Sequence, residues 1–131
     1  MRNGNVAADH IILMAYDDIA SANINPFPGQ IFNKPTPKGV AGYDVYAGCE
    51  IAYSGDDVTA ENFYSVLTGD ASSVPDGKPV LGSTTDDEVF VYFTDHGGTG
   101  LIAMPVGDYV YYDELNATLT SMHDKGLYSK L

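Results

Sequence analysis

Two unbroken apolar runs dominate the hydrophobic pattern of this chain. One covers Ile11–Met14 within the segment His10–Tyr16, and the other covers Val89–Phe93. Neither run alternates with polar residues, which is typical of strands that are buried on both faces of a mostly parallel sheet. We therefore expect two central strands, at His10–Tyr16 and at Val89–Phe93.

Two helices are predicted by apolar residues at helical spacing and by residues suited to helix ends. The first begins after Thr59, a suitable N-cap, and ends at Gly69. The second has Asp113 as its N-cap and runs to Lys125, with Gly126 as its stop. The expected buried positions are Phe63, Val66 and Leu67 in the first helix, and Leu115, Leu119 and Met122 in the second.

A β-hairpin is expected between the central strand and the second helix. Its strands would be Leu101–Met104 and Tyr109–Tyr112, joined by the turn residues Pro105–Asp108. The resulting order is strand, loop, helix, strand, hairpin and helix. That order predicts an α/β fold, and the length of 131 residues corresponds to one domain.

The net negative charge of the chain excludes some classes of binding partner. Six Lys and Arg residues stand against 18 Asp and Glu residues, and the formal net charge is -12. Such a charge repels phosphate backbones and anionic lipid surfaces, so we expect neither nucleic-acid binding nor membrane insertion. No apolar run approaches the ~20 residues that a membrane-spanning helix requires. The single cysteine, Cys49, excludes an internal disulfide.

The stretch with the clearest chemical content is Thr94–Gly100, which follows the apolar run Val89–Phe93 directly. Its histidine, His96, can transfer protons near neutral pH. The three glycines of this stretch allow backbone N–H groups to approach a substrate and to stabilise developing negative charge. We expect the His96 ring at the end of a central strand, facing a solvent-accessible cleft. The alternative is a turn histidine whose glycines serve only the backbone geometry.

Two acidic groups invite a metal ion, and both have a simpler interpretation. Asp17 and Asp18 follow the first predicted strand and would suit a metal ion or a cationic substrate, but a solvated loop is favoured. The triplet Asp86–Glu88 lacks the spacing of an EF-hand, so a solvated entry to the central strand is expected there. The sequence predicts no cofactor and no metal site.

Several segments resemble the legumain family of cysteine endopeptidases. They are Met14–Ala20, Asn25–Gly29, Tyr53–Thr59 with Asn62 and Phe63, Val66–Asp70 and, above all, Tyr92–Gly100, which is similar to the family's catalytic-histidine motif. The likeness extends in order and spacing from about Met1 to Leu131. It implies a caspase-like αβα sandwich with a mostly parallel central sheet. It also implies hydrolysis of peptide bonds after asparagine, sometimes aspartate, and a lysosomal or vacuolar location, or secretion.

The resemblance also assigns roles to three residues. His96 matches the catalytic histidine, and Gly97 matches the glycine that supplies an oxyanion-hole amide. Asp95 matches an aspartate that cyclises to a succinimide in some members. The implied mechanism is acyl transfer, in which a cysteine thiolate attacks the carbonyl carbon, His96 protonates the leaving amine, and backbone N–H groups hold the oxyanion.

The family's nucleophile has no match in this chain. It follows the histidine, in a Glu-Ala-Cys motif at the end of the next strand, and no cysteine follows His96 here. Cys49 precedes the histidine, in a loop that holds no nucleophile in the family, so we expect it to be a bystander. We interpret residues 1–131 as a partial legumain-like peptidase domain, incomplete at both ends, which lacks the first strand-helix unit and the nucleophile strand. Alone, it is expected to be inactive and to expose unpaired sheet edges.

Two other functions remain open at this stage. The first is a non-catalytic fragment or degenerate paralogue that acts as a binding module, which the missing nucleophile favours. The second is a subunit similar to the transamidase that attaches lipid anchors, which has a similar His-Gly-Gly loop. The expected partner of the endopeptidase is a peptide or protein with asparagine at the cleavage site. Asn116 begins an N-glycosylation triplet and is a candidate glycan site.

Overall fold

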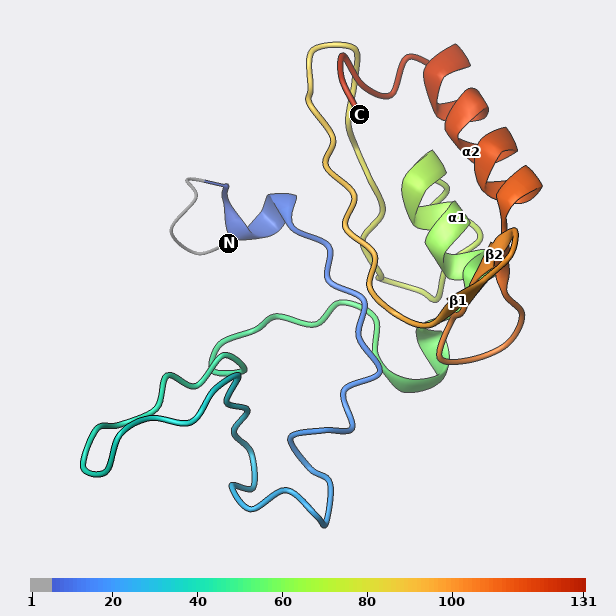
Figure 1. The fold of residues 1–131 in the computed structure, drawn as a ribbon. Helices are drawn as coiled ribbons and strands as arrows, with labels where there is room; N and C mark the ends of the chain where they lie inside the picture. The colour runs from blue at the N-terminus through green and yellow to red at the C-terminus, as the bar shows by residue number, and fades with distance from the viewer. Residues whose placement is uncertain (1–5) are drawn as a thin grey trace.

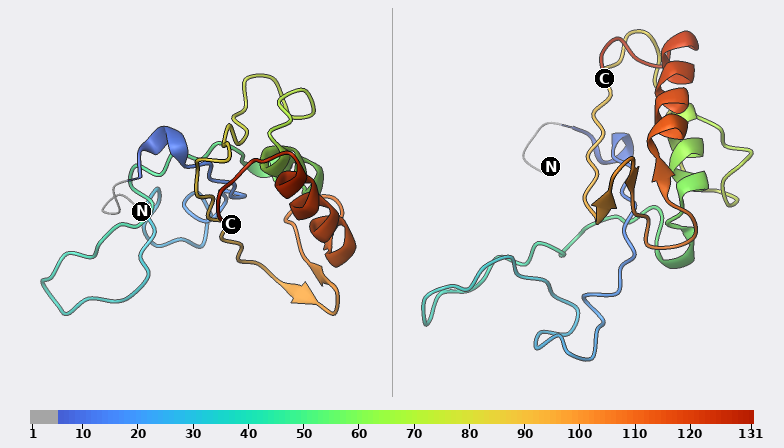
Figure 2. Two further views of the ribbon diagram at one scale, coloured as in Figure 1. Left: turned by 90° about the horizontal axis from the view of Figure 1, so that it is seen from above. Right: turned by 45° about the vertical axis from the view of Figure 1, so that its right-hand side comes forward.

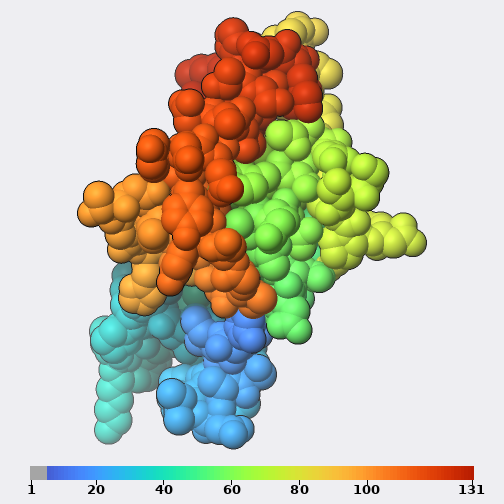
Figure 3. Space-filling view, turned by 90° about the vertical axis from the view of Figure 1, so that its right-hand side faces the viewer, coloured from blue at the N-terminus to red at the C-terminus, as the bar shows by residue number. Residues whose placement is uncertain are grey.

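A computed structural model describes residues 6–131 (Figure 1). Two short 3₁₀-helices, η1 (Ala8–His10) and η2 (Gly55–Asp57), precede the two α-helices of the chain. Figures 1 and 2 show α1 (Ala60–Thr68) and α2 (Tyr112–Asp124) side by side, with a small sheet at one end of the pair. In the space-filling view the two helices pack against each other, above a lobe formed by the N-terminal third of the chain (Figure 3).

Helix α1 lies where the sequence predicts it, and both of its ends are satisfied. The Thr59 side chain accepts a hydrogen bond from the Asn62 N–H at 3.2 Å. Gly69 ends the helix in the left-handed conformation, with φ 70°. A Cβ at Gly69 would lie 2.8 Å from the Leu81 carbonyl oxygen, so a glycine is required there for space as well as for conformation.

Helix α2 begins two residues earlier than predicted, and its expected cap is wrong. The N-cap is Tyr111, which has extended backbone and makes no side-chain capping bond, whereas the Asp113 carboxylate accepts from the Glu114 N–H at 3.0 Å within the first turn. The reason is that β3 (Val110–Tyr111) runs straight into the helix. The predicted stop is confirmed, because Gly126 has φ 63°.

The residues that the two helices bury agree in part with the buried positions that the sequence predicts. Val66, Leu67 and Met122 are buried as expected. Phe63 is half-buried and packs edge-on against the Phe93 ring, with the ring centroids 5.7 Å apart. Leu115 and Leu119 are only half-buried, whereas Thr118, which the apolar pattern omits, is buried.

A three-stranded antiparallel sheet carries the glycine-rich stretch. Its order is β1 (Gly97–Gly98), β2 (Leu101–Ile102) and β3, with neighbours antiparallel. The pairing of β2 with β3 confirms the predicted hairpin in a shorter form. Strand β1 was not predicted, because two glycines have the weakest strand preference and pair here only through their backbone.

The two expected central strands are not regular strands within residues 6–131. The segment His10–Tyr16 forms one parallel bridge, which pairs Met14 with Tyr53. A second parallel bridge pairs Glu88, the residue before Val89–Phe93, with Lys130. A mostly parallel sheet is therefore not confirmed.

The predicted burial of Val89–Phe93 on both faces is wrong for this chain. Phe90 is 84% exposed and Tyr92 is 70% exposed. Among the described residues, the parallel pairing next to this segment is the single bridge between Glu88 and Lys130. A strand without neighbours on both sides has no ladder to hold it and no surface to bury its side chains.

The core is small and centres on Tyr53, Val58 and Val66. The Tyr53 hydroxyl donates to the Pro79 carbonyl oxygen at 2.8 Å, which satisfies the polar end of this fully buried ring. Lys78 donates to the Ala52 carbonyl oxygen at 2.7 Å, so two neighbouring residues, Lys78 and Pro79, are tied to the chain at Ala52 and Tyr53. Among the described residues, no helix has the length and apolar character that a membrane span requires.

We expect Thr59→Ala to lower the free energy of unfolding by about 1 kcal/mol, because the Asn62 N–H loses its acceptor at the start of α1. Urea denaturation followed by circular dichroism measures this change. Thr59→Ser keeps a hydroxyl and is the matched control. Equal stability of the alanine variant and the parent chain would contradict the capping role.

The contact between the helices predicts a loss of stability at alkaline pH. The Tyr64 hydroxyl donates to Glu114 Oε2 at 3.2 Å, and burial together with this bond raises the pKa of Tyr64 to about 12 from its ordinary value of 10.0. The neutral phenol is thus favoured in the folded state. Its contribution is complete below pH 10 and is lost as the pH rises through about 12.

We therefore expect Tyr64→Phe to reduce the fall in the free energy of unfolding between about pH 10 and pH 12. Denaturant titrations at several pH values measure it. The fall does not vanish, since the pKa values of Tyr46, Tyr53 and Tyr111 are raised as well. The control is Tyr43→Phe, at a residue that is 80% exposed. Parallel pH profiles for Tyr64→Phe and the parent would refute the expectation.

Candidate functional site

The candidate histidine lies at the entry of the β1–β2 hairpin. The His96 carbonyl oxygen accepts from the Ala103 N–H at 2.8 Å, and the His96 N–H donates to Asp95 Oδ1 at 2.6 Å. The backbone of His96 is thus held on both sides. His96, Asp95 and Gly97 are all exposed, so the histidine is not sealed in an apolar pocket. The expected cleft around the ring stays a prediction.

The register of the hairpin directs the Gly97 N–H away from β2. Gly97 stands opposite Ile102. The next pair along, His96 with Ala103, is hydrogen-bonded. Hydrogen-bonded and non-hydrogen-bonded pairs alternate in an antiparallel ladder, and the N–H groups of a non-hydrogen-bonded pair face outward. Because β1 is an edge strand of the described sheet, the Gly97 amide points to its open edge.

A residue that sequence reasoning missed holds the tip of this hairpin. The Tyr112 N–H donates to the Gly100 carbonyl oxygen at 3.0 Å. Gly100 has φ 77°, and a Cβ there would lie 3.2 Å from the Tyr112 ring. The first residue of α2 therefore fixes the turn between β1 and β2. Only the glycine at position 100 signals a turn in the sequence, and nothing local points to Tyr112.

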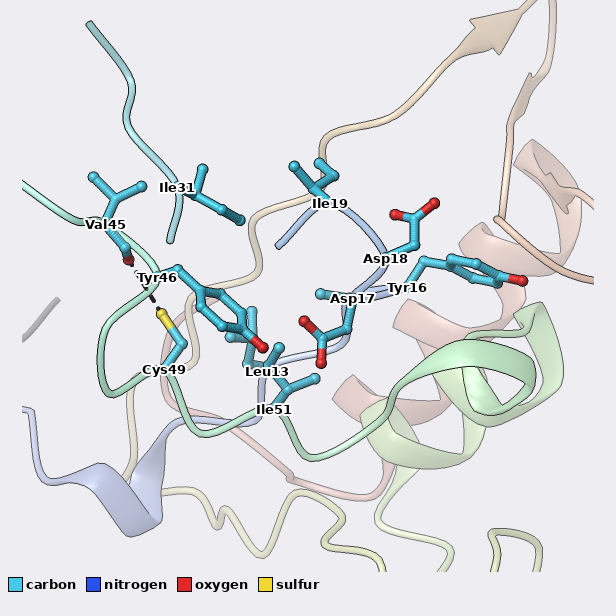
Figure 4. A pocket seen from close by; sticks show the side chains of 11 residues that line it. Leu13, Tyr16, Asp17, Asp18, Ile19, Ile31, Val45, Tyr46, Cys49 and Ile51 are labelled. Atoms are coloured by element: carbon cyan, nitrogen blue, oxygen red, sulfur yellow. Dashed lines mark hydrogen bonds between the residues drawn. The ribbon is translucent and has the colours of Figure 1, made fainter. Parts of the chain in front are cut away.

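The aspartates after the first predicted strand line a hollow of about 310 Å³ (Figure 4). Asp17 and Asp18 lie in irregular chain, and Asp17 has φ 67°, which is unusual for a residue other than glycine. The walls of the hollow are largely aliphatic, and Cys49 lies among them. Within residues 6–131, no group of three or more ligating side chains is placed to hold a metal ion.

The acidic triplet at Asp86–Glu88 completes a turn and ends at Glu88, the residue whose backbone pairs with Lys130. Asp87 Oδ2 accepts from the Thr84 N–H at 2.8 Å and from the Thr84 hydroxyl at 2.9 Å. These bonds lower the pKa of the Asp87 carboxyl. Glu88 bridges Lys130 through the backbone. The carboxylates thus serve local structure and solvation, in line with the simpler interpretation.

Cys49 is exposed, and its thiol donates to the Val45 carbonyl oxygen at 3.4 Å. His96 is not among the residues that line the hollow beside this thiol. That Cys49 is a bystander stays a prediction. The candidate glycan acceptor, Asn116, is exposed on α2, whereas Thr118 of the same triplet is 9% exposed.

Comparison with known proteins places the chain in one family. The model of the Peptidase C13 family matches residues 1–131. A vacuolar-processing enzyme from Vicia sativa is 46% identical over all of this chain and 26% of its own length. A legumain from Mus musculus is 45% identical over 99% of this chain and 29% of its own length. The chain thus spans about a quarter of the length of these curated relatives.

These matches confirm the resemblance on which the assignment of His96, Gly97 and Asp95 depends, although they do not test the three roles. The relatives carry the names of proteases, and they match along the whole stretch from the first apolar run to the second helix. This chain belongs to the peptidase C13 family, a family of cysteine endopeptidases.

Proposed function

We propose that this chain supplies the catalytic histidine loop of a cysteine endopeptidase that cleaves after asparagine and, in some substrates, after aspartate. One observation carries the proposal. An exposed histidine and an outward-pointing glycine amide are adjacent at the open edge of β1, within a motif that resembles the family's catalytic-histidine stretch. An acid-base group and an oxyanion donor are two of the three parts that acyl transfer requires.

In the proposed mechanism a thiolate attacks the carbonyl carbon of the scissile bond. The Gly97 N–H donates to the oxyanion of the tetrahedral intermediate, and His96 protonates the amine as it leaves. Water then hydrolyses the acyl-enzyme, with His96 as the base. Asp95 holds the backbone N–H of His96 and so orients the loop.

The nucleophilic thiol is proposed to come from outside these 131 residues, since no cysteine follows His96 in the chain. The parallel pairing of Lys130 with Glu88 supports this. Any segment that continued in that register would run beside Val89–Phe93 toward His96. It would reach the level of the histidine after roughly seven residues, because paired residues advance one for one. We accordingly propose that residues 1–131 are part of a peptidase domain.

The remaining parts of the proposal concern substrate and location. The substrate is a peptide or protein with asparagine at the cleavage site, and the location is lysosomal or vacuolar. The name of the vacuolar-processing enzyme from Vicia sativa supports the vacuole. A glycan on Asn116 is proposed as well. Its attachment would precede the packing of α2, because the Thr118 side chain that completes the triplet is buried.

The absence of a cysteine after His96 favours a second candidate, a non-catalytic module. The two candidates make opposite predictions for His96 once a thiol is provided. An endopeptidase requires the imidazole, whereas a binding module does not. A chimera with a relative provides that thiol and separates the candidates.

We expect a chimera in which residues 1–131 replace the matching segment of mouse legumain to cleave an asparagine-containing peptide. His96→Ala in that chimera should lower kcat by about 10²–10⁴-fold, because the leaving amine loses its general acid. The matched control is His123→Ala, at a side chain that is 75% exposed on α2. Residues 1–131 alone serve as the inactive reference. Retained activity in His96→Ala, with an equally active His123→Ala, would contradict the proposed role.

The oxyanion role of Gly97 has its own test in the same chimera. Gly97→Pro removes an N–H that makes no bond to β2, and proline is tolerated at outward positions of edge strands. We expect kcat to fall by about 10²–10³-fold with little change in KM. Gly97→Ala keeps the N–H, and its Cβ would meet the nearest atom at 3.4 Å, so it is the control. Equal kcat values for the two variants would remove Gly97 from the oxyanion hole.

A further inference from the structure

The hairpin that carries the Gly97 amide is weakly specified by its own residues. The pair Gly98 and Leu101 closes the strands, and the two residues between them form the turn. The second of these, Gly100, has φ 77°, whereas the first, Thr99, has no positive φ, which is the pattern of a type II turn. Such a turn splays the strands of a two-residue hairpin, and glycine-rich strands define their register loosely. A contact from outside the hairpin is therefore needed to fix the register.

Strand β3 and helix α2 make that contact. The Tyr112 N–H donates to the Gly100 carbonyl oxygen at 3.0 Å, which continues the β2–β3 ladder by one pair. The Tyr112 ring also lies against Gly100, since a Cβ there would be 3.2 Å from it. Val110 of β3 is 1% exposed, so the strand that leads to Tyr112 is fixed in the core. The position of Gly100 is thus set by β3 and α2.

Helix α1 supports the same stretch at its other end. The Phe63 ring packs edge-on against Phe93, the residue before Thr94–Gly100, with the ring centroids 5.7 Å apart. The neighbouring Tyr64 hydroxyl donates to Glu114 Oε2 at 3.2 Å and ties α1 to the first turn of α2. The two helices therefore hold the histidine stretch at both of its ends.

We propose that Tyr112 is a positioning residue for the Gly97 amide and acts through its own backbone N–H. This role rests on the proposed function, in which the Gly97 amide stabilises the oxyanion. Without the bond to Gly100, the hairpin is free to shift by one residue, which turns the amide into the sheet. An oxyanion donor acts mainly on the tetrahedral intermediate, so the loss of the bond lowers kcat and leaves KM nearly unchanged.

Tyr112→Pro, in the chimera with mouse legumain, removes this N–H. Proline is well tolerated at the first position of a helix, and Tyr111 already has the extended backbone that suits a residue before proline. We expect kcat to fall by about 10²-fold. Tyr112→Ala loses the ring as well but keeps the N–H, so it should rescue most of kcat. Equal kcat values for the proline and alanine variants would overturn the role of the N–H.

A double variant separates positioning from a general loss of stability. If Tyr112 acts through Gly97, Tyr112→Pro should lower kcat no further once Gly97→Pro has removed the amide. A merely structural effect would multiply the two losses and overturn the inference. Thr59→Ala, which weakens only the cap of α1, is the stability control and should leave kcat at the parent's value.

The register also has a readout that needs no activity. The Ala103 N–H donates to the His96 carbonyl oxygen at 2.8 Å in the observed register. In the 131-residue chain, hydrogen exchange followed by NMR should be faster at Ala103 in Tyr112→Pro than in Tyr112→Ala. Equal protection of Ala103 in the two variants would overturn the inference.

The same set of variants distinguishes this inference from the proposed function. Equal kcat values for Gly97→Pro and Gly97→Ala would refute the oxyanion role of Gly97, and the positioning role of Tyr112 with it. An impaired Gly97→Pro beside a fully active Tyr112→Pro would overturn the role of Tyr112 alone.

Discussion

The register of β1 on β2 is the constraint on which the candidate site depends. With Gly97 opposite Ile102, the Gly97 amide points outward and the His96 carbonyl is tied to Ala103. A shift of one residue would exchange these roles, because inward and outward groups alternate along the strand. The amide would then be used within the sheet. The turn at Gly100, fastened by Tyr112, therefore decides whether the Gly97 amide, the proposed oxyanion donor, faces this edge.

The helices were predictable because their signals are local. Thr59 and Gly69 act through bonds within a few residues of α1, and Gly126 ends α2 in the same way. The cap of α2 was not predictable on those grounds. Tyr111 is held extended by its pairing with Leu101, which is ten residues away, and the helix starts directly after it. A long-range pairing thus overrides the capping preference of Asp113.

The strands were predicted less well, for a related physical reason. An apolar run such as Val89–Phe93 indicates that a segment is suited to burial. Burial also requires neighbouring strands and helices, which the run itself does not supply. Within residues 6–131 the neighbours make only single bridges, and Phe90 stays exposed. Membership of the C13 family implies the caspase-like fold, in which such a segment would be a paired strand. The candidate residues, in contrast, stand in one contiguous motif, so their assignment depends on no long-range pairing, and their roles stay predictions.

The contrast between local and long-range structure also applies to the chemistry. The histidine, its adjacent aspartate and the glycine amide are consecutive, so a hairpin of a few residues brings them together. A nucleophilic thiol is not part of this hairpin, because the one cysteine of the chain is Cys49. Helix α2 returns the backbone to Lys130, in parallel with Glu88, at the start of the segment that leads to His96. The same helix therefore fastens the hairpin at its first turn and leads into the segment that pairs with Glu88.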